Sequence, residues 1–200
     1  MLKVLGKLPR ELVVAVSGGP DSMAILDFLN NNHNVTAYYF DHGTTFGDEA
    51  YHFLRSYCAG KKIPFVTSVL SESRPSGKSL EEHWRDERYK RFHDYKLPIV
   101  TGHNLDDVIE WFLFSSVHGK GKFIPYQNKN VIRPFLSTSK QNLVDWCTRK
   151  NVPFLTDPGN NNRKFMRSII RHDMMPVAKE INPGIQKTFK KIVESRYNNN

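Results

Sequence analysis

Apolar runs alternate with amphipathic stretches through the first two thirds of the chain. Residues 12–16 are apolar without a break, as expected for a strand that is buried on both faces. Similar runs and β-branched residues predict strands at residues 11–16, 35–40, 64–70, 97–101 and 131–135. Apolar residues at helical spacing predict helices at residues 20–30, 48–61, 79–93, 104–114, 138–151, 165–177 and 185–196.

Local sequence signals support two of these helices and also predict three loops. Pro20 suits the first turn of a helix, and Ser79 and Glu82 stand at the spacing of a capping box. Segments 71–78, 119–130 and 157–162 are rich in loop-forming residues. The order of strands and helices predicts an α/β fold with a parallel sheet that is covered by helices on both faces.

Ligands of such sheets bind beyond the carboxyl ends of the strands. Three polar segments follow predicted strands directly, at residues 17–22, 41–45 and 102–107. We therefore expect these segments to lie together and to form the functional site.

The first of these segments reads Ser17-Gly18-Gly19-Pro20-Asp21-Ser22. Its glycines allow a sharp turn whose N–H groups approach an anion, and the positive end of the next helix points to the same place. Ser17 and Ser22 add hydroxyl donors, whereas Asp21 suits a phosphate site only if Mg²⁺ bridges the two. The segment predicts a pyrophosphate site, and the alternative is an ordinary glycine-rich turn. It is neither a Walker A loop nor a G-x-G-x-x-G loop.

A second polar cluster follows the strand predicted at residues 97–101. His103, Asp106, Asp107 and Glu110 share one face of the helix 104–114, because they lie at i, i+3, i+4 and i+7. Carboxylates gathered there would repel one another, so we expect a cation nearby. The alternative is a solvated acidic face.

Another helical face carries Glu81, Arg85 and Arg88. This spacing is typical of a salt-bridge ladder within a helix. Equally, Arg85 and Arg88 would suit a site that holds phosphate or orients a substrate carboxylate. The sequence leaves both interpretations open.

The charge of the chain points to a polyanionic partner. The 200 residues carry a net charge of +9, and a surplus of this size favours nucleic acid or nucleotide, although a soluble protein can also be basic without such a partner. Residues 161–200 hold nine Lys or Arg and three Asp or Glu. The densest part comprises Arg163, Lys164, Arg167 and Arg171, which either contact phosphates or form a solvated basic face.

Several other classes of protein find no support. Cys58 and Cys147 form no C-x-x-C pair, which argues against a zinc or redox site and fits a reducing cytoplasm. Residues 1–10 lack the apolar core of a signal peptide, and no apolar run approaches the roughly 20 residues that span a bilayer. We expect a cytoplasmic protein without a membrane partner.

The segment at residues 17–22 resembles the PP-loop of the N-type ATP pyrophosphatases, which cleave ATP between the α and β phosphates. The rest of the chain resembles one of their families, tRNA(Ile)-lysidine synthetase, over nearly its whole length. Residues 40–43 resemble its x-[ND]-H-G segment, and residues 81–89 its E-x-x-x-R-x-x-R-Y helix. Residues 102–110 resemble A-H-H-x-D-D-Q-x-E, residues 133–136 R-P-L-L, and residues 157–171 D-x-S-N followed by R-N-x-x-R.

Several positions depart from these patterns. Asn104 stands at the family's second His and Val108 at its Gln, while Gly159 and Ser168 replace a Ser and an Asn. In spite of these changes, the resemblance still implies adenylation chemistry. The part of the reaction that the changes affect is the identity of the nucleophile. Many members of the family also carry further C-terminal domains, so the chain resembles a short form.

The resemblance implies a PP-loop ATP-binding domain at residues 1–136 and a basic helical extension at residues 137–200 that contacts tRNA. The implied reaction uses ATP and Mg²⁺ to adenylate C2 of a cytidine in the anticodon loop of an isoleucine tRNA, and L-lysine then replaces AMP. The implied catalytic residues are Asp21, His103, Asp106 and Asp107, and the implied metal ligands are Asp21, Asp106 and Asp107. The implied nucleotide-binding residues are Ser17, Gly18, Gly19, Asp21, Ser22 and His42. The residues implied for substrate or tRNA are Arg85, Arg88, Glu110, Arg163, Lys164, Arg167 and Arg171.

Three other functions compete with this one. A PP-loop tRNA thiolase would need reactive cysteines, and Cys58 and Cys147 lie outside the predicted loops. A ligase that resembles an amidotransferase would need an ammonia source, and no glutaminase nucleophile is visible. A catalytically inactive module that binds RNA or nucleotide would fit the departures at Asn104 and Val108.

Overall fold

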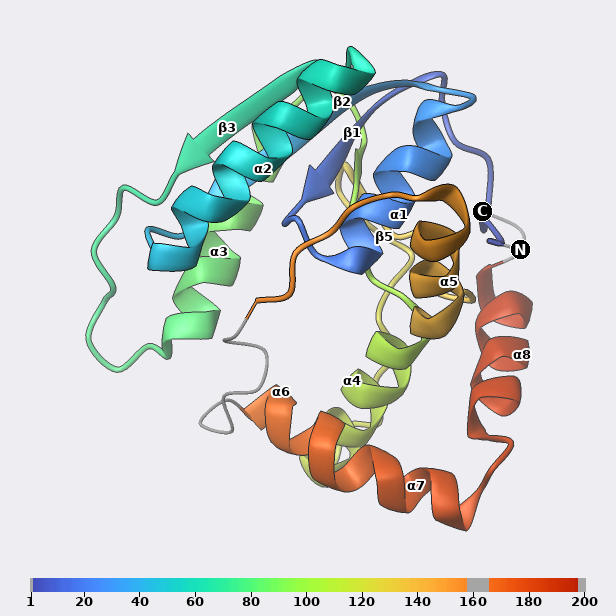
Figure 1. Cartoon of the computed structure of the whole chain (residues 1–200). Coiled ribbons are helices and arrows are strands. Elements are labelled where there is room, and N and C mark those ends of the chain that lie inside the picture. The colour runs from blue at the N-terminus through green and yellow to red at the C-terminus, as the bar shows by residue number, and fades with distance from the viewer. Residues whose placement is uncertain (1, 158–165, 198–200) are drawn as a thin grey trace.

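A single mixed sheet occupies the centre of the computed structural model, which describes residues 2–157 and 166–197 (Figure 1). The strand order is β3-β2-β1-β4-β6-β5, and every neighbouring pair is parallel except β5 and β6. The strands are β1 (Glu11–Val16), β2 (Asn34–Asp41), β3 (Phe65–Val69), β4 (Ile99–Val100), β5 (Gln127–Asn128) and β6 (Val131–Ile132). The predicted parallel α/β sheet is confirmed.

Helices connect the parallel strands. They are α1 (Pro20–Asn30), α2 (Thr45–Lys61), α3 (Leu80–His93), α4 (Leu105–Val117), α5 (Lys140–Lys150), α6 (Met166–Ile169), α7 (Met175–Ile181) and α8 (Ile185–Tyr197), with a π-helical segment, η2 (Ile170–Met174), between α6 and α7. Each predicted helix up to residue 151 is present with its ends shifted by a few residues.

The two faces of the sheet are both buried, which explains the continuous apolar run of β1. Leu12, Val14 and Val16 join the larger core, which α1, α2, α4, α5 and α8 share. Val13 faces the opposite way, into a smaller core beneath Phe92 of α3. Because successive side chains of a strand point to opposite faces, an uninterrupted apolar run was needed to fill both cores.

Several segments differ from the prediction, and β4 and β6 each span only two of the five residues predicted for them. The expected loop 119–130 contains β5, which forms a two-residue hairpin turn with β6 in which Lys129 has a φ of +53°. The expected continuous helix 165–177 is interrupted by η2, which lies directly before the first turn of α7, where Pro176 stands. Proline has no N–H and crowds the carbonyl of the preceding turn, so the hydrogen-bond ladder widens before it.

The C-terminal helices pack on the sheet domain. Trp146 of α5 contacts Phe28 of α1 with 5.2 Å between the ring centroids, and Phe189 of α8 contacts Phe112 of α4 at the same separation. The division into domains at residue 136 stays a prediction. None of the helices in the described ranges is both long enough and apolar enough to cross a membrane.

Candidate active site

The carboxyl ends of β1, β2 and β4 surround a cavity of about 450 Å³. The loop after β1, the end of β2, one face of α3, the start of α4 and residues 155–157 line it. All three polar segments that follow strands in the sequence thus meet at one place, because parallel strands end at the same edge of the sheet.

The loop at residues 17–22 is shaped by its own hydrogen bonds. Gly18 has a φ of +83°, which favours glycine, and its carbonyl accepts a hydrogen bond from the N–H of Leu155 at 2.8 Å. Ser22 is 6% exposed, and its hydroxyl accepts from the N–H of Ser17 at 3.1 Å and donates to the carbonyl of Gly19 at 3.0 Å. Ser22 therefore holds the turn together. No side chain of the described residues caps α1 at Gly19, so the N-terminus of α1 is open to an anion.

Asp21 lies at the start of α1, and its two carboxylate oxygens differ in their hydrogen bonding. Asn104 donates its side-chain N–H to Oδ2 at 3.3 Å, whereas Oδ1 is buried and has no hydrogen-bond partner among the described residues. Burial raises the pKa of Asp21 to about 6, with Lys140 acting against this rise and Asp107 adding to it. A buried, half-satisfied carboxylate at the mouth of the loop fits a cation that also contacts phosphate.

Asn104 and Asp107 form the N-terminus of α4. The side-chain oxygen of Asn104 accepts from the N–H groups of Asp106 and Asp107 at 2.9 Å and 3.2 Å. Oδ2 of Asp107 accepts in return from the N–H of Asn104 at 2.9 Å, which completes a capping box. Asp107 lines the cavity beside Asp21 and is oriented by the helix that it caps.

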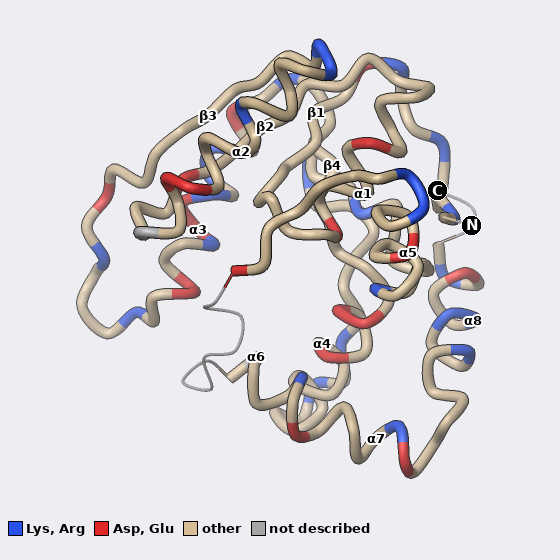
Figure 2. Tube along the Cα trace, viewed as in Figure 1, with Lys and Arg blue, Asp and Glu red and all other residues tan. Residues whose placement is uncertain are grey.

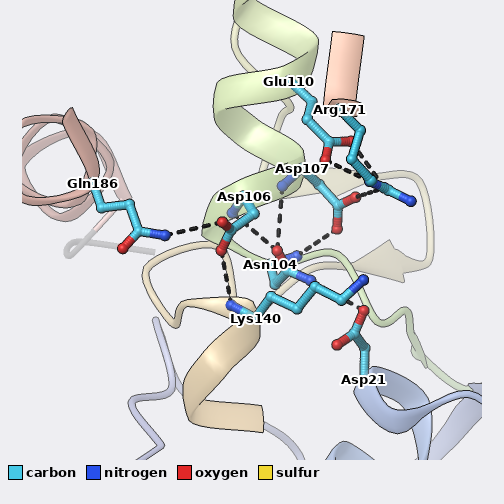
Figure 3. Close-up of polar contacts among 8 residues, drawn as sticks. All are labelled: Asp21, Asn104, Asp106, Asp107, Glu110, Lys140, Arg171 and Gln186. Atoms are coloured by element: carbon cyan, nitrogen blue, oxygen red, sulfur yellow. Dashed lines mark hydrogen bonds and ion pairs between the residues drawn. The ribbon is translucent and has the colours of Figure 1, made fainter. Parts of the chain in front are cut away.

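Asp106 points away from Asp21 and Asp107 (Figure 3). Its Oδ2 accepts from the backbone N–H of Lys140 at 2.8 Å, and its Oδ1 accepts from the side chain of Gln186 at 2.9 Å. Within residues 2–157 and 166–197, no three or more His, Cys, Asp or Glu side chains gather as a metal site. Asp106 therefore lies apart from Asp21 and Asp107, which both line the cavity, and the three metal ligands stay a prediction.

Glu110 and Arg171 form an ion pair between α4 and η2. Nε and Nη2 of Arg171 donate to the two carboxylate oxygens of Glu110 at 2.7 Å and 2.9 Å, and Glu110 is only 4% exposed. The hydrogen bond to Glu110 raises the pKa of Arg171. A further contact of 3.9 Å joins Arg171 to Asp107. Both predicted tRNA-contacting residues are thus engaged with each other in this structure.

Three other residues that are predicted to contact RNA belong to the basic segment at residues 161–200. Arg163 and Lys164 lie outside the described residues, and so does the side chain of Arg167. Their contact with tRNA stays a prediction.

The far wall of the cavity is aromatic. The ring of His42 lies 5.0 Å from Phe40 and 5.0 Å from Trp84, measured between ring centroids. Burial, together with the positive charge of Arg88, lowers the pKa of His42 to about 4, so this imidazole is neutral at physiological pH. A neutral aromatic wall of this kind suits the stacking of a nucleobase.

The remaining predicted residues divide between the cavity and the surface. His103 lines the cavity, with its Nδ1 2.9 Å from the hydroxyl of Thr101, and Arg88 lines it from α3. Arg85 is exposed on α3, with its guanidinium 5.7 Å from the ring centroid of Tyr89, and it is not part of the cavity wall. The two arginines therefore have different surroundings.

Sequence reasoning missed three contributors. Trp84 lies one turn before Arg88, a spacing that would have placed it on the same helical face. Leu155 and Lys140 gave no local signal in the sequence. Leu155 meets the loop, and Lys140 lies near Asp21, only because the fold brings together residues that are far apart in the chain.

The chain is similar to several known proteins. The family model of the PP-loop domain matches residues 2–178. A tRNA(Ile)-lysidine synthase of Francisella philomiragia is 29% identical over 202 residues, which cover 94% of this chain and 50% of that protein. One of Thermotoga maritima is 31% identical over 204 residues, which cover 92% and 49%. The chain spans about half the length of the curated relatives it matches.

The fold also resembles a solved structure. The NH3-dependent NAD synthetase from Campylobacter jejuni superposes with a TM-score of 0.52 over 98% of this chain and 86% of that chain, at 15% sequence identity. This similarity concerns the fold alone.

Proposed function

Because the chain belongs to the PP-loop domain family, we propose that it uses ATP to adenylate C2 of a tRNA cytidine and then replaces AMP with lysine, as a tRNA(Ile)-lysidine synthetase. The observation that carries the ATP site is the open N-terminus of α1 beside the half-satisfied carboxylate of Asp21. The relatives of the chain, which bear that enzyme's name, support the choice of product.

The loop at residues 17–22 binds the phosphates of ATP through backbone N–H groups and the positive end of α1. Asp21 and Asp107 would hold Mg²⁺, and this ion would neutralise charge on the departing pyrophosphate. Asp106 supports this site indirectly, because it ties the start of α4 to α5 and α8. His42 and Trp84 form the wall against which a nucleobase stacks.

The proposed reaction has two steps. The O2 atom of the cytidine attacks the α-phosphate of ATP, and pyrophosphate leaves. An amine of lysine then attacks C2, and the C2–O bond breaks to release AMP. His103, which lies in the cavity and is hydrogen-bonded to Thr101, takes the proton from the amine.

A sulfur-transfer reaction has less support from the cysteines. Cys58 and Cys147 are buried, and burial raises the pKa of each thiol to about 11. Thiols in this state do not form the thiolate that sulfur transfer needs.

The test combines ATP, labelled L-lysine and total tRNA. We expect pyrophosphate release that depends on tRNA, and label in an isoleucine tRNA whose modified nucleoside gains the mass of lysine less water. Pyrophosphate release without attachment of lysine to any RNA would overturn the proposal that the product is a lysine-modified nucleoside. A chain that binds tRNA but releases no pyrophosphate would indicate a binding module.

The location of the protein in the cytoplasm, where tRNA is modified, forms part of the same proposal. The contact of the basic helices with tRNA is also part of this proposal.

A further inference from the structure

Asn104 joins two parts of the site that are far apart in the sequence. Its side chain is 1% exposed, and all of its polar atoms are used. The side-chain oxygen caps α4, and the side-chain nitrogen donates to Oδ2 of Asp21 (Figure 3). One rigid amide plane therefore sets the direction of α4 and the position of the loop carboxylate together.

Few side chains can do both tasks. Serine, threonine and aspartate also cap helices, but serine and threonine carry a single hydroxyl one bond nearer to the backbone, and an ionised aspartate carries only acceptors. None of them places an N–H where the amide of Asn104 does. Histidine offers an N–H but is a weaker cap. Asparagine combines the acceptor that the helix needs with the donor that Asp21 needs.

The contact decides which oxygen of Asp21 stays available. Asn104 engages Oδ2, and Oδ1 is left buried without a partner among the described residues. Without the amide, the carboxylate of Asp21 would be free to rotate about its terminal torsion and to change the oxygen that it presents.

We propose that Asn104 is a positioning residue for the nucleotide site, which fixes Asp21 so that its free oxygen meets the metal of ATP·Mg²⁺. The inference rests on the proposed ATP site, and not on the identity of the RNA or of the nucleophile. It assigns a role to a position where the chain departs from the pattern of the family that it resembles.

Asn104→Ser tests it, because serine keeps a cap and removes the amide N–H that reaches Asp21. ATP affinity is measured by calorimetry with Mg²⁺ and with a chelator, and pyrophosphate release is measured beside it. We expect the gain in ATP affinity that Mg²⁺ confers on the wild type to shrink by about 10-fold or more in the variant. We expect kcat for pyrophosphate release to fall by about 10- to 100-fold, with little change in ATP affinity under chelation.

Two controls separate positioning from stability. Ser79→Ala removes the cap of α3, where the hydroxyl of Ser79 accepts from the N–H of Glu82 at 3.2 Å, and it should leave the Mg²⁺ effect unchanged. Asn104→Thr repeats the test with a second residue that caps without an amide N–H, should the serine variant fold poorly.

An unchanged Mg²⁺ effect in a folded Asn104→Ser or Asn104→Thr protein overturns the inference and leaves the proposed function standing. A wild type that gains nothing from Mg²⁺ overturns the inference as well. Failure to attach lysine to RNA overturns the proposed function, while the calorimetric test of Asn104 keeps its meaning.

Discussion

At the scale of single residues, burial in the cavity shifts the pKa values of Asp21 and His42. The pKa of Asp21 rises to about 6, and that of His42 falls to about 4. Each shift disfavours the charged form, since a charge in a partly dry cavity loses its hydration. The two groups therefore affect stability with opposite signs over the same range of pH.

Asp21→Asn should abolish pyrophosphate release and at the same time stabilise the fold. The folded-state pKa of this carboxyl lies above the unfolded value of 3.8, so its ionisation destabilises the protein as pH rises from about 4 to above 6. The amide carries no charge and removes a cost of roughly 2–3 kcal/mol at pH 8. Urea unfolding at pH 8 and at pH 4 measures the gain, which should vanish at the lower pH. Wild-type turnover in this variant would contradict the assigned role.

His42→Phe should make the protein less sensitive to acid. The unfolded imidazole takes up a proton below pH 6.5, but the folded one does so only below about 4, so the wild type loses stability as pH falls between these values. The loss attributable to His42 is about 3 kcal/mol at most. The measurement compares the unfolding free energies of wild type and variant from pH 7 to pH 4. Their difference separates the contribution of His42 from that of Asp21.

His52→Phe, at an exposed position of α2, is the control for that comparison. If the variant at residue 42 and the control show the same pH dependence, burial of His42 does not govern acid stability.

At the scale of elements, α4 is the hub of the site. Its first turn contacts the loop after β1, α5 and α8, and its second turn contacts η2 (Figure 3). The π-helical segment turns Arg171 toward α4, where it meets a carboxylate that is almost fully buried. A buried charge without a partner is costly, so this ion pair contributes to holding η2 against α4.

Arg171→Gln should destabilise the protein by about 3 kcal/mol, because it leaves Glu110 buried and unpaired. Protease cleavage within residues 166–197 should become faster, which limited proteolysis followed by mass spectrometry would detect. The double variant Glu110→Gln with Arg171→Gln should recover much of the loss. Removal of the exposed pair between Lys3 and Glu194, by Lys3→Gln, should cost at most about 1 kcal/mol.

At the scale of the whole molecule, positive charge is spread unevenly over the fold. Figure 2 shows several basic positions along α8, which packs against the helix that starts at the cavity. Lys187, Lys190 and Lys191 of this helix are exposed. The spacing of these lysines places them near one another on the helix surface, as expected for contacts to a phosphate backbone.

Replacement of Lys187, Lys190 and Lys191 by Gln should weaken tRNA binding and leave ATP affinity unchanged. Each lost phosphate contact should reduce the slope of log affinity against log salt by roughly 0.7–0.9. Filter binding between about 50 and 200 mM salt measures both effects. The matched control changes Arg55, Lys61 and Lys96, three exposed cations outside residues 137–200, to Gln. An equal loss of affinity in that control would show that α8 is not the RNA surface.

The sequence by itself determined the framework and the position of the site. The apolar run of β1 and the glycines that follow it act locally, so the strand, the turn and the start of α1 follow from neighbouring residues alone. The rule that ligands meet the carboxyl ends of parallel strands then brought His42, His103 and Asp107 to the same cavity. Helical spacing also placed Asp107 and Glu110 correctly on one side of α4.

Only the tertiary structure decided which of these charges face a ligand. Asp106 shares the predicted acidic face, but the N-terminus of α5 and a glutamine of α8 draw it to the other side. Arg171 sits in the most basic segment, yet a buried carboxylate 61 positions away engages it. Periodicity gives directions around one helix axis, whereas the partner of a charged group comes from whichever distant element packs beside it. The proposed role of Asn104 also depends on the tertiary structure, because its contact with Asp21 spans 83 positions of the chain.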